Sequence, residues 1–129
     1  MNGNGTMKKI LVVDDEEDLR SAIVAALRLR GFDLFEADNG VDAYNLAKSV
    51  LPNLVISDVM MYTGSGFILH EFLKRDERTA HIPLVLMTGH AQGAGAWGSE
   101  SDVEYIEKPF ALDDLFTLVD KKLGKQTSQ

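Results

Sequence analysis

The feature that most restricts the fold of this 129-residue sequence is a regular alternation of short apolar runs with stretches of helical periodicity. The apolar runs cover Lys9–Val13, Phe32–Ala37, Leu54–Ser57, Leu84–Thr88 and Val103–Ile106. Short runs of this kind are typical of strands that are buried on both faces. Consecutive strands separated by helices form a parallel sheet with right-handed crossovers and helices on both sides. The sequence therefore predicts an α/β fold with a doubly wound, five-stranded parallel sheet.

Four further segments carry apolar residues at helical spacing. Gly31 is placed to end the first helix and Gly124 to end the last. The second helix is expected to begin near Asp38 or Asn39 and to end before Pro52. The apolar positions are Leu19, Ile23 and Leu27, then Ala43, Leu46, Ala47 and Val50, then Ile68, Leu69, Phe72 and Leu73, and finally Leu112, Leu115, Phe116, Val119 and Leu123.

The segment between the fourth and fifth runs is rich in glycine. It contains Gly89, Gly93, Gly95 and Gly98, and each glycine inside a helix costs about 1 kcal/mol relative to alanine. We therefore expect a short or irregular fourth helix. Residues 93–98 also spell the G-x-G-x-x-G pattern of dinucleotide-binding loops. They do not directly follow a strand, and acidic residues come next, which argues against a bound pyrophosphate.

Length, charge and cysteine content limit the function classes. A chain of this length forms one domain, which we place at residues 8–124, with a disordered leader at 1–7 and a flexible tail or linker at 125–129. The net charge of −7 argues against direct binding to nucleic acid or to an anionic membrane. The sequence has no cysteine, no signal-peptide pattern and no apolar run of membrane-spanning length, so we expect a cytoplasmic protein.

Three acidic residues end two of the predicted strands. Asp14 and Asp15 follow the first run, and Asp58 follows the third. In a parallel sheet these side chains meet at one edge, where ligands bind. At a spacing of roughly 4 Å and an effective dielectric near 20, each pair of carboxylates repels by about 4 kcal/mol, so the cluster needs a cation. Oxygen ligands without histidine or cysteine suit Mg2+, or Mn2+ in its place.

The same edge also receives a hydroxyl and an amine. Thr88 ends the fourth run and Lys108 follows the fifth. Asp58 stands alone at its strand end, so it is the natural nucleophile, and a carboxylate that attacks phosphorus forms an aspartyl phosphate. Phosphoryl transfer needs mainly positioning and neutralised charge, which a metal held by the acid pair and the lysine would supply. The Thr88 hydroxyl could then donate to a phosphoryl oxygen.

This set resembles the receiver domain of two-component response regulators, a flavodoxin-like fold. The matching motifs are Asp14-Asp15, Asp58, Thr88 and Lys108-Pro109-Phe110, with Gly66 eight positions after Asp58, and the match spans about Lys8 to Leu123. The resemblance implies that Asp58 takes a phosphoryl group from a phosphohistidine on a sensor histidine kinase or a histidine phosphotransfer protein. It also implies a conformational switch that controls a partner or output domain outside this chain. Such a domain catalyses its own phosphotransfer and autodephosphorylation but turns over no independent substrate.

The resemblance also assigns roles within the site. Mg2+ would be bound by Asp15, Asp58 and the backbone carbonyl of Met60, with Asp14 acting through water. Met60 would further tune phosphoryl hydrolysis together with His90.

The remaining family roles concern the strand ends around the lysine. The Lys108–Pro109 peptide is usually cis in the family, and proline is the residue for which a cis bond costs little. Tyr105 would be the switch aromatic that turns inward as Thr88 moves toward the phosphate. Tyr62 departs from the family, which often has proline at that place.

Other interpretations remain open at this stage. A phosphorylation-independent interaction module with the receiver fold is the main alternative, although such a module would be expected to lack an acid or the lysine. A phosphohydrolase would show D-x-D after the first strand, and a flavin-binding protein would show a Ser/Thr-rich loop there. The acid pair could simply cap the first helix, and Tyr105 could be a packing residue. His70 and His81 show no metal-ligand spacing and are expected to be solvated or cap-like.

Overall fold

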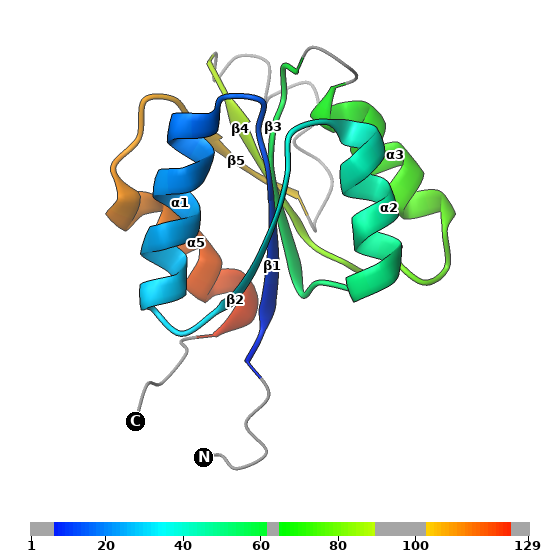
Figure 1. The fold of residues 1–129 in the computed structure, drawn as a ribbon, viewed down its shortest axis with the longest axis horizontal. Helices are drawn as coiled ribbons and strands as arrows, with labels where there is room; N and C mark the ends of the chain where they lie inside the picture. Colours follow the sequence, from blue (N-terminus) through cyan, green and yellow to red (C-terminus); the bar gives the residue numbers. More distant parts are fainter. Residues whose placement is uncertain (1–6, 62–64, 90–102, 125–129) are drawn as a thin grey trace.

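The computed structural model describes residues 7–61, 65–89 and 103–124. Strands and helices alternate along this part of the chain, as Figure 1 shows. In chain order the elements are β1 (Lys9–Val13), α1 (Glu17–Leu29), β2 (Asp33–Ala37), α2 (Gly40–Val50), β3 (Leu54–Asp58), α3 (Gly66–Arg75), β4 (Leu84–Thr88), β5 (Val103–Glu107) and α5 (Leu112–Leu123). The predicted α/β class is confirmed.

The five strands form one parallel sheet in the order β2-β1-β3-β4-β5. The predicted strands agree with the structure to within one residue. β2 begins at Asp33 instead of Phe32, and β3 and β5 each continue one residue further, to Asp58 and Glu107. The order reverses between β1 and β3, and in such sheets ligands bind beyond the carboxyl ends of the strands at this point.

Helices cover both faces of the sheet, with α1 and α5 on one side and α2 and α3 on the other (Figure 1). Successive side chains of a strand point to opposite faces, and β1 shows the result. Ile10 and Val12 join the buried cluster under α1 and α5, whereas Leu11 and Val13 join the cluster under α2 and α3. All four are fully buried, which explains why the strand has no polar residue in this stretch.

Local interactions fix three of the helix ends, and the sequence predicted those at Asn39 and Gly31. Asn39 begins α2, and its side chain accepts a hydrogen bond from the Asp42 amide at 2.8 Å. Ser65 caps α3 in the same way through the Ile68 amide at 3.2 Å. Gly31 follows the end of α1 with φ of 98°, a conformation that favours glycine.

The buried face of α3 differs from the expected one. Gly66, Leu69, His70 and Leu73 are buried, whereas Ile68 and Phe72 are 48% and 41% exposed. The prediction that His70 is solvated or cap-like is therefore wrong. The residue lies inside α3 and is 9% exposed, and its Nε2 atom has no hydrogen-bond partner in the part of the chain that the structure describes. His81 is exposed, as expected.

Several predictions fall on residues outside the described ranges. They are the short or irregular fourth helix, Tyr62, His90, most of the leader at 1–7 and the tail at 125–129. Among the helices of the described residues, none combines the length and the apolar character needed to cross a membrane.

Candidate functional site

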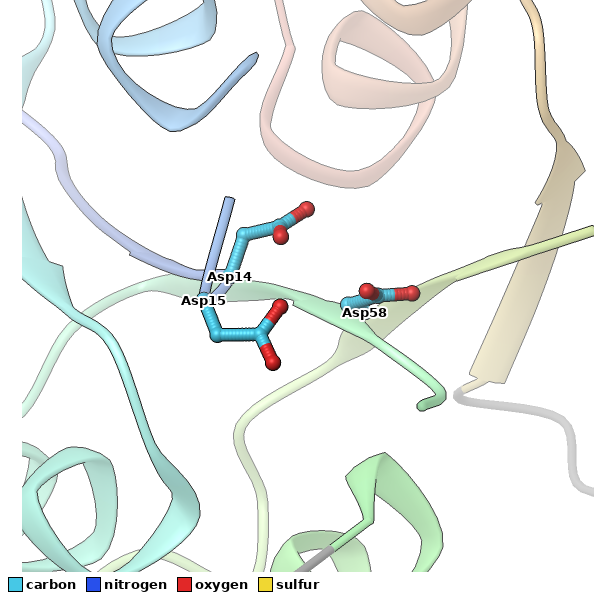
Figure 2. Close-up of side chains that lie close together, drawn as sticks. All are labelled: Asp14, Asp15 and Asp58. Atoms are coloured by element: carbon cyan, nitrogen blue, oxygen red, sulfur yellow. The ribbon is translucent and has the colours of Figure 1, made fainter. Parts of the chain in front are cut away.

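The three predicted carboxylates meet at the carboxyl edge of the sheet. Val13 pairs with Ser57 in the β1–β3 ladder, so Asp14 and Asp58 emerge from neighbouring strands at the same level. One oxygen from each of Asp14, Asp15 and Asp58 lies within 4.8 Å of the others, and Figure 2 shows the three carboxylates gathered at this edge. Asp14 is fully buried, Asp58 is buried and Asp15 is half-buried.

Lys108 brings a positive charge to this cluster from the far side of β4. Its Nζ atom lies 3.3 Å from Asp58 Oδ2 and 3.4 Å from Asp14 Oδ2. The residue directly follows β5, and its backbone N–H donates to the Thr88 carbonyl oxygen at 2.7 Å. The Lys108–Pro109 peptide bond is cis. The amine therefore lies between two carboxylates that come from different strands.

Burial and charge shift the ionisation of the nucleophile candidate. Burial raises the pKa of the Asp58 carboxyl, and the negative charge of Asp14 raises it further. The Lys108 ammonium and a backbone hydrogen bond from Met60 act in the opposite direction without cancelling the rise. An ionised Asp58 thus lacks part of its counter-charge, which a cation would supply.

The same contacts also shift the pKa of Lys108, where the neighbouring charges outweigh the effect of burial. Burial by itself lowers the pKa of the Lys108 amine, but the charges of Asp14 and Asp58 outweigh burial, so the net shift is upward. Lys108 is therefore held in its charged form at neutral pH.

The backbone around the two buried acids is fixed by further hydrogen bonds. The Asp14 N–H donates to the Ala37 carbonyl oxygen at 3.1 Å, and Asp14 Oδ1 accepts from the Glu16 N–H at 2.8 Å. Because Asp14 Oδ2 faces Lys108, this carboxylate supports the turn with one oxygen and the site with the other. The N-cap residue of α1 is Glu16, so the acid pair is not merely a helix cap.

Thr88 and Tyr105 lie on neighbouring strands. Thr88 is the last residue of β4 and is 9% exposed. Tyr105 is half-buried in β5, opposite Leu86, and packs against the apolar cluster under α2 and α3. The structure places both residues on the side of the site away from Asp14 and Asp15, and their switch role stays a prediction.

Met60 follows β3 immediately, and its side chain is 75% exposed. Its backbone lies close enough to the Asp58 carboxylate for a hydrogen bond, which places the Met60 peptide at the rim of the site. Pro109 is exposed and Phe110 half-buried, and both line a shallow pocket with Lys108 next to the site.

Two residues near the acids were not given a role from the sequence. Arg20 of α1 donates a hydrogen bond to the backbone oxygen of Asp14 at 2.7 Å. Its only signal in the sequence is that it is the first basic residue after the five consecutive acids of Asp14–Asp18. Ser57 is fully buried and donates from Oγ to the Asp58 carbonyl oxygen at 2.9 Å, and nothing distinguishes it from other strand residues in the sequence.

The donor set fits a magnesium ion. Three carboxylates from Asp14, Asp15 and Asp58 supply hard oxygen ligands, and no histidine joins them in the described cluster. Mg2+ is commonly held by one or two carboxylates while it keeps several waters, and the half-exposed Asp15 leaves room for such waters.

The fold and this edge of the sheet together define a receiver-type α/β domain. The family model described as "Response regulator receiver domain" matches residues 10–120. The chain therefore belongs to the response regulator receiver family, which serves phosphorylation-based signalling in two-component systems.

Curated relatives and a solved structure agree with this assignment. The phosphate regulon transcriptional regulatory protein PhoB of Pseudomonas aeruginosa is 36% identical over 84% of this chain and 48% of its own length. A histidine kinase of Formosa agariphila is 42% identical over 81% of this chain and 8% of its own length. The chain thus spans about half of the first relative and a small part of the second.

One similar solved structure is the receiver domain of a sensor histidine kinase from Pseudomonas aeruginosa, described with a magnesium ion coordinated in its active site cleft. It superposes with a TM-score of 0.82 at 21% identity and covers 93% of this chain and all of that chain. At this identity the likeness shows the fold.

Proposed function

We propose that this domain accepts a phosphoryl group on Asp58 from the phosphohistidine of a sensor histidine kinase or a histidine phosphotransfer protein. The observation that supports this most is that the Asp58 carboxylate lies close both to the Asp14–Asp15 pair and to the Lys108 amine. An isolated structural carboxylate would need neither neighbour.

Magnesium is the proposed cofactor, and Mn2+ has the same preference for oxygen. Asp14, Asp15, Asp58 and the backbone carbonyl of Met60 would hold the ion. When bound, it would neutralise charge on the carboxylates and on the phosphoryl oxygens. The magnesium ion described for the structural relative in its active site cleft supports this assignment.

The transfer is a simple exchange of bonds. An Asp58 carboxylate oxygen forms a bond to phosphorus while the bond from phosphorus to the imidazole nitrogen breaks, and its electron pair stays on that nitrogen. Lys108, 3.3 Å from Asp58, is placed to stabilise the transferring oxygens. Attack of water on the phosphorus of the acyl phosphate later returns free Asp58 and inorganic phosphate. Met60 and His90 are proposed to control how readily water enters.

Thr88 and Tyr105 are proposed to carry the response. The Thr88 hydroxyl would donate to a phosphoryl oxygen on Asp58, and Tyr105, one strand further, would change its packing as Thr88 moves. The output lies outside this chain. It belongs either to a longer regulator, as the half-length match to a transcriptional regulatory protein suggests, or to a separate partner.

Intact mass spectrometry tests the proposal. After incubation with acetyl phosphate and Mg2+, the protein should gain the mass of one phosphoryl group, and Asp58→Asn should gain none. Asp113→Asn, which removes an exposed carboxylate on α5, is the matched control and should behave like the parent. If the parent gains no mass and also fails to bind the phosphate mimic fluoroberyllate, the phosphorylation-independent interaction module is the correct function.

A further inference from the structure

Arg20 links three parts of the structure next to the acidic cluster. Its Nη1 donates to the Asp14 backbone oxygen at 2.7 Å, and its Nε donates to Glu36 Oε1 at 2.9 Å. The side chain is only 16% exposed, although it lies on the first turns of an outer helix. The guanidinium therefore connects α1, the turn after β1 and strand β2.

The oxygen that Arg20 holds belongs to the peptide that joins Asp14 to Asp15. The orientation of this peptide determines where the chain carries Asp15 after β1 ends. On the other side of Asp14, its N–H donates to the Ala37 carbonyl oxygen. β2 thus restrains both peptides of Asp14, one directly through Ala37 and the other through Glu36 and Arg20.

A planar arginine suits this arrangement better than a lysine. The guanidinium offers five N–H donors in fixed directions, so it can donate to a carbonyl and to a carboxylate at once. A lysine amine at this position could not fix both acceptors with the same geometry. The pairing with Glu36 also offsets the positive charge of Arg20 close to a site that must attract a cation.

We propose that Arg20 is a positioning residue for the metal site: it fixes the Asp14–Asp15 peptide so that the two carboxylates converge with Asp58. This inference rests on the proposed function, because it assigns to Arg20 an effect on Mg2+ binding. Arg20 would contact neither the metal nor the phosphoryl group.

If Arg20 acts only through its charge, neutralising it should change the Mg2+ affinity in one direction. If it acts by positioning the acids, the affinity should change in the opposite direction. Removing a positive charge beside a divalent site strengthens cation binding if only Coulombic repulsion matters. If Arg20 instead positions the acids, its loss weakens binding, because groups that orient metal ligands typically contribute about tenfold or more to metal affinity. The sign of the change therefore distinguishes the two roles.

The experiment is a Mg2+ titration followed through the backbone amide NMR signals of Asp15 and Val59. Arg20→Gln should weaken Mg2+ binding by about tenfold. Arg28→Gln is the matched control, because it removes the same charge from an exposed position of the same helix, and its affinity should equal that of the parent. Arg20→Lys should lie between the parent and Arg20→Gln.

A second measurement separates positioning from a loss of folding. The phosphorylation rate with acetyl phosphate should need more Mg2+ for half-saturation in Arg20→Gln, while the rate at saturating Mg2+ stays within about twofold of the parent. A cooperative unfolding transition in urea would show that the variant is folded before urea is added.

Arg20→Gln or Arg20→Lys that binds Mg2+ as tightly as the parent, or more tightly, would overturn the assignment of Arg20 while the proposed function stands. A parent protein that binds no Mg2+ would instead remove the proposed metal site, and the role of Arg20 with it.

Discussion

Gly66 lies so close to Asp58 that a Cβ atom on the glycine would be 2.6 Å from the Asp58 carbonyl oxygen. The Gly66 N–H also donates to the Val59 carbonyl oxygen at 2.9 Å. The first residue of α3 is thus in contact with the backbone of the candidate phosphoacceptor. A side chain at this position would have to move either the helix or the strand end.

Gly66→Ala should therefore destabilise the protein. The added methyl group meets backbone, which cannot rotate away, so we expect a loss of about 1–3 kcal/mol in the free energy of unfolding. Urea denaturation measures this loss. Gly89→Ala is the control, because a Cβ there meets no atom of the described structure within 4 Å. Equal stabilities of the two variants would show that the contact between Gly66 and Asp58 is relaxed in solution.

The raised pKa of Asp58 gives a prediction for stability against pH. A carboxyl whose pKa is higher in the folded state stabilises the fold below its ordinary pKa of 3.8, and this contribution is lost as the pH rises through the folded-state pKa. At neutral pH and without divalent ions, Asp58→Asn should therefore be more stable than the parent.

The comparison should be made in urea with a chelator, at about pH 7 and again at about pH 4, where the difference should shrink. Asp33→Asn, on the edge strand β2 and outside the acidic cluster, is the control and should show no such difference. A parent that is more stable than Asp58→Asn at neutral pH would show that the folded state does not oppose the ionisation of Asp58.

Removal of the Lys108 amine should have opposite effects on stability and on metal binding. Lys108→Gln leaves Asp14 and Asp58 without their positive neighbour, and we expect the metal-free protein to lose about 1–2 kcal/mol of stability. Mg2+ should bind more tightly to the variant, because one repelling charge is gone.

Thermal unfolding with and without Mg2+ measures both effects of Lys108→Gln. Lys8→Gln, which removes the charge of an exposed lysine, should change neither quantity. Weaker Mg2+ binding by Lys108→Gln would mean that the lysine orients the carboxylates as well as neutralising them.

The coupling between Thr88 and Tyr105 can be tested with a phosphate mimic. In the parent labelled with 3-fluorotyrosine, fluoroberyllate and Mg2+ should shift the 19F NMR signal of Tyr105. Thr88→Val keeps the shape of the side chain but removes its hydroxyl, so the variant should bind the mimic without this shift. Thr117→Val on α5 is the control. A full Tyr105 shift in Thr88→Val would exclude the hydroxyl as the link.

The sheet and the acidic cluster were predictable from the sequence because both depend on local patterns. Strands buried on both faces leave continuous apolar runs, and residues that end parallel strands meet at one edge. Asp14, Asp15, Asp58 and Lys108 therefore come together as predicted. The binding of Mg2+, which the acidic cluster predicts, and the switch roles of Thr88 and Tyr105 stay proposals.

The orientation of α3 could not be predicted in the same way. Its apolar residues fit a stripe that includes Ile68 and Phe72, but the buried stripe contains Gly66 and His70 instead. The close approach of Gly66 to the Asp58 backbone fixes how the helix is rotated. Phe72 then lies at the surface, where its ring packs 5.6 Å from that of Tyr44 of α2. The rotation of α3 thus depends on a contact between distant parts of the chain, which hydrophobic periodicity cannot predict.

The contacts of Arg20 could not be predicted from the sequence for a related reason. Its partners are a backbone oxygen after β1 and a carboxylate on β2, and sequence spacing gives no information on backbone acceptors. On periodicity alone, an arginine in the first turns of a surface helix is a solvated residue.

The position of β3 within the sheet has a mechanical consequence. β3 is bonded to β1 and β4 along its length, whereas β5 has only one bonded neighbour in the described sheet. If charge is added at the end of β3, the strand cannot slide in response without breaking its hydrogen bonds to both β1 and β4. Displacement costs less at β5, the edge strand of the described sheet, which carries Tyr105 and leads to Lys108. The sheet is therefore stiff at the strand end where Asp58 would be phosphorylated, and more compliant at the strand that carries Tyr105.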